Sequence, residues 1–134
     1  MRVWCLALLI LVGAGSAAQD NPITGDFTKS PTEHIINIIE QPFVVRSVKG
    51  IVQIQGNAPG AFDVLFEIQG PGNERTIRHA MTGKRGQFKI GHVPDGEYKF
   101  KATLNGFQSV MGRITVSGKA PKQNEIKVLM RIGI

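Results

Sequence analysis

Apolar and polar residues alternate along most of the chain after Phe43, as in β-strands with one face turned inward and the other to water. The runs with this character are residues 48–55, 62–68, 76–81, 87–90, 98–104, 110–116 and 126–132. No stretch of helical length shows a 3.6-residue apolar period. The pattern therefore predicts about seven strands and an all-β fold.

Residues that favour turns lie between these runs. Glycine, proline, asparagine and serine gather at residues 56–60, 70–73, 94–96, 105–106 and 117–123. Each of these residue types stabilises a chain reversal, either by tolerating a positive φ or by fixing a negative one. Short strands that recur every 8–12 residues or so are typical of sandwiches and barrels. We predict a seven-stranded Greek-key β-sandwich over residues 44–134.

Residues 82–107 carry a recurring pattern of glycine, proline and aromatic residues. Its members are Gly86, Phe88, Pro94, Gly96, Tyr98, Gly106 and Phe107. The glycines suit tight turns, and the aromatic rings supply large core side chains. The pattern resembles the carboxypeptidase regulatory-like domain of the transthyretin-like (prealbumin-like) sandwiches, and the resemblance extends over about residues 45–132. It implies a β-sandwich of the carbohydrate-binding-like fold group, in which these seven residues are structural.

Residues 19–43 precede the predicted sandwich and are interrupted by prolines. Proline and polar residues at this density indicate an extended leader or linker. Within it, residues 33–40 are rich in isoleucine and favour either an extra strand or a short helix.

The first residues have the three parts of a secretory signal peptide. Arg2 precedes an unbroken apolar run from Val3 to Val12, and small residues lead to a cleavage site after Ala18. The run is too short for a membrane anchor, which needs about 20 apolar residues. We therefore expect residues 1–18 to be removed. The mature protein would be secreted or periplasmic, with no transmembrane segment.

Composition sharpens this expectation. The chain has 134 residues, one cysteine, one tryptophan and a formal charge of +6. Cleavage after Ala18 would remove Cys5 and Trp4 and lower the charge to +5. An exported domain without disulfides is more typical of bacteria than of small eukaryotic secreted proteins.

Catalytic and metal-binding patterns do not occur in the sequence. The histidines, His34, His79 and His92, match no zinc-ligand spacing, and no hydrolase, metalloprotease or phosphate-loop motif is present. We therefore predict no enzyme activity, no metal site and no cofactor.

The basic excess is the remaining candidate for a binding surface. The basic side chains on the predicted outward faces are Lys49, Lys99, Lys101, Arg113, Lys127 and Arg131. Together they form a candidate patch for anionic partners such as cell-surface polymers or lipid headgroups. The alternative is a solvated face that protects the sheets from aggregation. Nucleic acid is not expected, because the protein is predicted to be exported and few aromatic rings are available for stacking.

The function predicted from these features is a non-catalytic module for protein–protein or cell-envelope interaction. The alternative is a polysaccharide-binding module, which the fold group of the resemblance implies. Sugar-binding platforms use exposed aromatic rings, but the predicted mature chain lacks tryptophan and Tyr98 faces inward in the predicted strand. An exposed Phe62 or Phe107 would have to serve instead.

Overall fold

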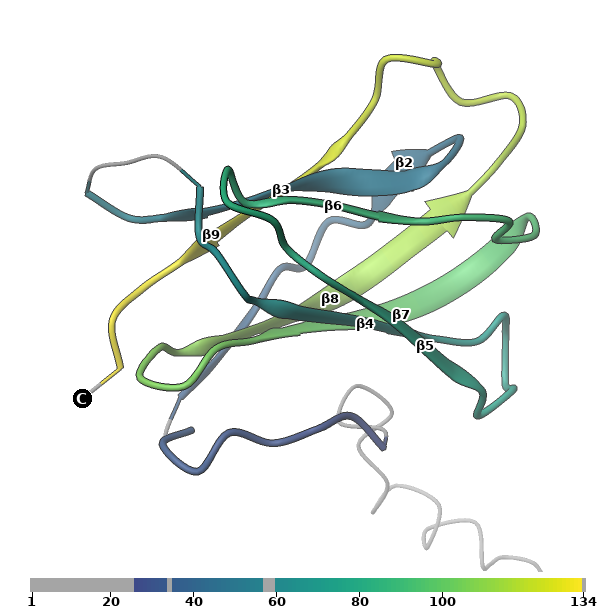
Figure 1. Cartoon of the computed structure of the whole chain (residues 1–134). Helices are drawn as coiled ribbons and strands as arrows, with labels where there is room; N and C mark the ends of the chain where they lie inside the picture. The colour runs from purple at the N-terminus through teal and green to yellow at the C-terminus, as the bar shows by residue number, and fades with distance from the viewer. Residues whose placement is uncertain (1–25, 34, 57–59, 134) are drawn as a thin grey trace, which may run out of the picture.

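The computed structural model describes residues 26–33, 35–56 and 60–133. The predicted signal peptide, the start of the leader and His34 lie outside the described residues. The described part contains strands and no helix, so no helix there could cross a membrane. The strands form two sheets packed face to face (Figure 1), which confirms the prediction of an all-β sandwich.

The larger sheet has the strand order β1-β8-β7-β4-β5, and β2 also pairs with β8. Its strands are β1 (Ile36–Ile38), β2 (Phe43–Val45), β4 (Leu65–Gln69), β5 (Ile77–Met81), β7 (Gly96–Thr103) and β8 (Ser109–Val116). The smaller sheet has the order β6-β3-β9. Its strands are β3 (Val48–Ile54), β6 (Gln87–Ile90) and β9 (Ile126–Met130).

The described residues therefore contain nine strands, and the predicted number of seven is too low. The two additional strands are β1 and β2, which both run parallel to β8 and pair with different parts of it. β3 and β9 are also parallel, whereas a Greek-key sandwich is built from antiparallel strands. The strands of each parallel pair are far apart in the sequence and are not joined by a tight turn. Local sequence patterns therefore do not reveal that they pair.

The core lies between the sheets and is centred on three phenylalanine rings. Phe66 of β4 stacks on Phe88 of β6 with ring centroids 4.0 Å apart, and on Phe100 of β7 at 5.2 Å. Phe66 and Phe88 belong to different sheets, so their contact joins the two layers. Burying three aromatic side chains contributes several kcal/mol, at about 2 kcal/mol or more for each.

The glycine, proline and aromatic pattern of residues 82–107 serves the scaffold. Gly86 has φ of +78°, and a Cβ there would lie 2.3 Å from the backbone oxygen of Val52. Tyr98 is buried, and its hydroxyl donates a 2.7 Å hydrogen bond to the carbonyl of Pro94. Phe107 packs against the edge of the core.

The described part of the leader lies across the outer face of the larger sheet. Residues 26–33, called the strap below, form the purple segment in Figure 1. The chain then reaches β1 at the edge of the same sheet. The smaller sheet covers the inner face of the larger sheet, and the strap covers part of its outer face, where Lys101 is buried while Arg113 remains exposed.

Candidate functional site

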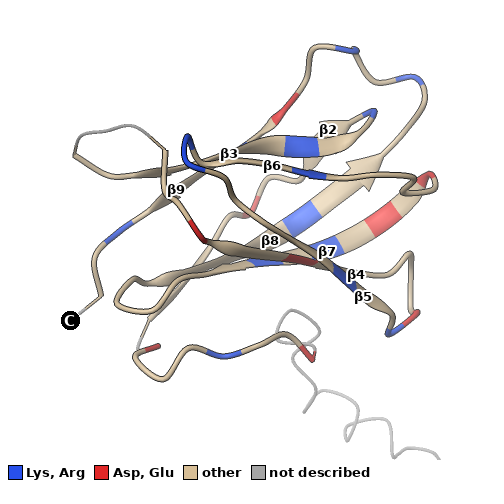
Figure 2. Ribbon diagram, in the orientation of Figure 1, with Lys and Arg blue, Asp and Glu red and all other residues tan. Residues whose placement is uncertain are grey.

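The six basic residues of the predicted patch do not come together. Lys99 and Arg113 are direct partners in the β7–β8 ladder, and Lys101 lies two residues further along β7, so all three point to the outer face of the larger sheet. Lys49 and Lys127 point to the outer face of the smaller sheet, on the opposite side of the sandwich. Arg131 follows β9. Basic residues therefore lie on both layers (Figure 2), and the six do not form one continuous surface.

Lys101 faces outward from the sheet but is not exposed to water. Its exposed fraction is 2%, because the strap covers it. Its Nζ atom lies 2.6 Å from Oε1 of Glu33, whose side chain is 9% exposed. The hydroxyl of Ser109 on β8 donates a second 2.6 Å hydrogen bond to the same carboxylate oxygen. A strand pattern distinguishes inward from outward residues but does not show what covers the outer face.

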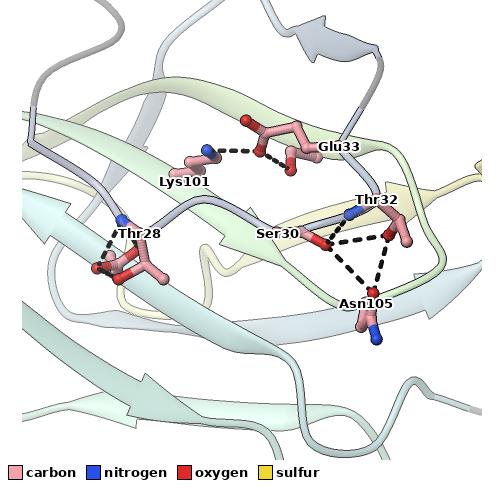
Figure 3. Close-up of polar contacts among 8 residues, drawn as sticks. Thr28, Ser30, Thr32, Glu33, Lys101 and Asn105 are labelled. Atoms are coloured by element: carbon pink, nitrogen blue, oxygen red, sulfur yellow. Dashed lines mark hydrogen bonds and ion pairs between the residues drawn. The ribbon is translucent and has the colours of Figure 1, made fainter.

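The rest of the strap is also held by polar contacts, and Figure 3 shows those of Thr28 and the one between Thr32 and Asn105. The backbone N–H of Thr28 donates to Oε1 of Glu67 at 3.1 Å, and its hydroxyl donates to Oε2 at 3.0 Å. The hydroxyl of Thr32 donates to Oδ1 of Asn105 at 2.9 Å and accepts a 2.8 Å hydrogen bond from the N–H of Gly106. These contacts attach the strap to β4 and to the turn after β7.

The electrostatics of Glu33 follow from this setting. Burial of the carboxyl raises its pKa, while hydrogen bonds from Lys101 and Ser109, together with the charges of Lys101 and Lys29, lower it. The lowering effects prevail, so the pKa lies below its ordinary value of 4.5. Glu33 is therefore ionised at neutral pH and forms a true ion pair with Lys101.

The outer face of the smaller sheet differs from that of the larger sheet, because no described segment of the chain lies across it. Three lysines lie on it: Lys49 and Lys89 are direct ladder partners on β3 and β6, and Lys127 lies beside Ile51 on β9. Among the described residues, none of these three side chains forms a hydrogen bond or an ion pair. Leu129, also on this face, is 48% exposed. We call Lys49, Ile51, Lys89, Lys127 and Leu129 the basic face.

Lys89 is not among the six outward-facing residues of the predicted patch, because the sequence groups it with Lys84 and Arg85 around one turn. The alternation of Gln87, Phe88, Lys89 and Ile90 already places this lysine on the outer side of its strand. Its partner, Lys49, could not be identified from the sequence, because the pairing of β3 with β6 joins distant parts of the chain.

The remaining candidate chemistry is sparse in the described residues. They hold no cluster of three or more histidine, cysteine or acidic side chains that could bind a metal ion. Phe62 is 58% exposed, whereas Phe107 is half-buried. A flat sugar-binding platform of several rings is therefore not formed by the described part of the chain.

Comparison with known proteins identifies the sandwich. Residues 43–129 match the family described as BOS complex subunit NOMO1-like, second beta sandwich domain. The match begins at the first residue of β2 and ends within β9, and it leaves the strap and β1 outside. A search of curated proteins found no match. The family match supports a β-sandwich, but it does not single out the carboxypeptidase regulatory-like group that the motif resembles. The chain belongs to the family of the NOMO1-like second beta-sandwich domain.

Proposed function

We propose that this protein is a non-catalytic module that binds an acidic surface of another protein through its basic face. The family description names a subunit of a complex, which supports a protein partner. The observation that carries the proposal is the difference between the two sheets. The strap covers the part of the larger sheet's outer face around Lys101, whereas the basic face is open and bears lysines without acidic partners among the described residues.

The composition of the basic face suits an acidic partner. Ile51 and Leu129 supply apolar area, and the lysine stems can extend it while their ammonium groups remain at the rim. Three positive charges on one face would attract a negatively charged protein surface and orient it during the encounter. Because such charges are exposed, their contribution should weaken as the salt concentration rises.

Carbohydrate binding is the alternative, and the exposed ring of Phe62 is the observation in its favour. A single phenylalanine offers one stacking surface. We place this alternative second and test it beside the first.

We further propose that the module is exported, secreted or periplasmic, and acts after removal of residues 1–18. The basis is the basic, apolar and small-residue order of the N-terminal sequence. An envelope extract is therefore the appropriate source of partners.

The test compares two charge-reversed proteins in capture from an envelope extract, followed by quantitative mass spectrometry. One carries Lys49→Glu and Lys127→Glu on the basic face. The other carries Lys119→Glu and Lys122→Glu in the loop before β9, so both lose the same charge. We expect the wild type and the loop variant to capture the same partner in similar amounts. The basic-face variant should capture at least tenfold less of it. The captured partner is then purified and titrated at rising salt.

Equal capture by both variants would contradict the proposal. So would a purified partner whose affinity does not fall with salt. Retention on a glycan array that Phe62→Ala abolishes would favour the carbohydrate alternative instead.

A further inference from the structure

Part of the outer face of the larger sheet is buried, although it carries several polar side chains. The buried polar side chains on it are Glu67, Gln69, Lys101, Thr103 and Ser109. In a two-layer sandwich the outer face of an antiparallel sheet normally meets water. If the strap left, water could solvate these groups, so the uncovered face would remain compatible with a soluble fold.

The strap is held by side chains rather than by a strand ladder. Residues 26–33 contain no strand. Their polar contacts to the rest of the domain run through the side chains of Asp26, Thr28, Ser30, Thr32 and Glu33. Phe27 is its single buried apolar side chain. A segment with few buried apolar contacts is the kind that opens locally while the rest of the domain stays folded.

The strap does not satisfy the whole polar face. Oε1 of Gln69 and Oγ1 of Thr103 are buried and have no hydrogen-bond partner among the described residues. Gln69 on β4 and Thr103 on β7 lie at opposite ends of the β4–β7 ladder, where Gln69 pairs with Lys99 and Thr103 with Leu65. Buried polar atoms are nearly always paired, so these two mark hydrogen-bonding capacity that the strap leaves unused.

We propose that this polar face is a second binding site, which takes an extended segment of a partner protein in place of the strap. The strap shows the chemistry that the site recognises. A hydroxyl or N–H donor must lie opposite Glu67, a hydroxyl opposite Asn105 and a carboxylate opposite Lys101. A partner segment with a further donor could also reach Gln69, which the strap does not.

The order of charges gives the site its direction and its selectivity. Glu67 and Lys101 are direct partners in the β4–β7 ladder but contact different residues of the strap: Glu67 accepts hydrogen bonds from Thr28, and Lys101 pairs with the carboxylate of Glu33. A segment with a base opposite Lys101 would leave two positive charges in a buried place, which strongly disfavours binding. The preferred occupant is therefore a segment rich in serine and threonine that ends in an acidic residue.

This site lies on the opposite side of the sandwich from the basic face, so the two proposals can fail independently. The probe is a fluorescent, C-terminally amidated peptide with the sequence of residues 26–33, titrated into the full chain by anisotropy. Glu33→Gln weakens the resident strap and should open the site to the peptide. We expect this variant to bind the peptide at least tenfold more tightly than the wild type does.

Three controls define the contacts. A peptide with glutamine in place of its glutamate should lose at least tenfold in affinity for Glu33→Gln, because it lacks the charge for Lys101. Adding Lys101→Met to Glu33→Gln should abolish binding of the original peptide. Adding Asn105→Ala, at an exposed turn residue that should not affect folding, should weaken it several-fold. Adding Lys49→Glu and Lys127→Glu of the basic face to Glu33→Gln should leave the affinity for the peptide unchanged.

Equal binding of the peptide by the wild type and by Glu33→Gln would overturn the proposal. So would binding that is insensitive to the peptide's glutamate or to Asn105→Ala. If light scattering shows that Glu33→Gln dimerises and excess peptide does not dissociate the dimer, the occupant is the strap of a second copy and the partner-segment proposal is wrong.

Discussion

Lys101 on a central strand and Glu33 in the strap form an ion pair of 2.6 Å that is almost completely shielded from water. Removing one member of a buried pair leaves the other charge without compensation. We therefore predict that Lys101→Met destabilises the protein by about 3 kcal/mol, close to the usual cost of breaking such a pair. Urea unfolding of the purified variant measures the change.

A double variant separates charge from packing. Because an apolar pair leaves no buried charge, Lys101→Met combined with Glu33→Met should recover most of the lost stability. Lys99→Met is the matched control on the same face, and it should change the stability by less than about 0.5 kcal/mol. A double variant no more stable than Lys101→Met alone would show that the loss does not arise from the unpaired carboxylate.

The same pair predicts a pH dependence. The pKa of Glu33 lies below its ordinary value of 4.5 in the folded protein, so the unfolded chain binds this proton first as the pH falls. The stabilisation is therefore present above the unfolded pKa and is lost as the pH falls through the folded one. We expect Glu33→Gln to flatten the decline of the unfolding free energy between about pH 6 and pH 3. Parallel curves for the two proteins would contradict this assignment.

Gly86 allows the β5–β6 turn to pass close to β3. It has φ of +78°, and a Cβ would lie 2.3 Å from the carbonyl oxygen of Val52. Gly86→Ala should therefore cost at least about 2 kcal/mol, because strain and a backbone clash combine. Gly91→Ala is the control, since no atom beyond the neighbouring residues of the chain lies within 4 Å of its Cβ position. Thermal unfolding of the two variants gives the comparison, and similar losses would rule out the clash.

The sequence allowed the inward and outward faces of single strands to be predicted, since each strand carries its own period of two. Val48 and Val52 are buried as their alternation indicates, and Lys49 points away from them. The sequence could not show which sheet a strand joins. For that reason, outward lysines from opposite layers were grouped into one predicted patch.

The strap was beyond prediction for a related reason. Its residues lack a strand or helix pattern, and each contact pairs it with a strand or turn far along the chain, as Glu33 does with Lys101 and Thr32 with Asn105. The outward position of Lys101 on its strand correctly indicated its direction. Only the folded chain shows that Glu33 lies there to neutralise it.

Export predicts a defined new N-terminus. When the full chain is expressed with a bacterial secretion system, we expect cleavage after Ala18 and a mature chain that begins at Gln19. Intact mass spectrometry of the secreted or periplasmic fraction measures this, with allowance for the loss of one ammonia if Gln19 cyclises. Replacing Ala18 with a bulky residue should block cleavage, and an unprocessed wild-type chain would contradict the prediction.

Tyr98 is the only tyrosine in the chain, so its ionisation can be followed directly. Its pKa is raised above 10.0, chiefly because burial disfavours the phenolate. A raised folded pKa means that its contribution to stability is present below the unfolded value and is lost as the pH rises through the folded one. Ultraviolet titration of the native protein should therefore give a midpoint above that of the unfolded chain.

Tyr98→Phe should lower the unfolding free energy by about 1 kcal/mol through loss of the hydrogen bond to Pro94. The variant should also lack the decline in stability at alkaline pH that Tyr98 causes. A native midpoint equal to that of the unfolded chain would show that the hydroxyl is not held in this buried position.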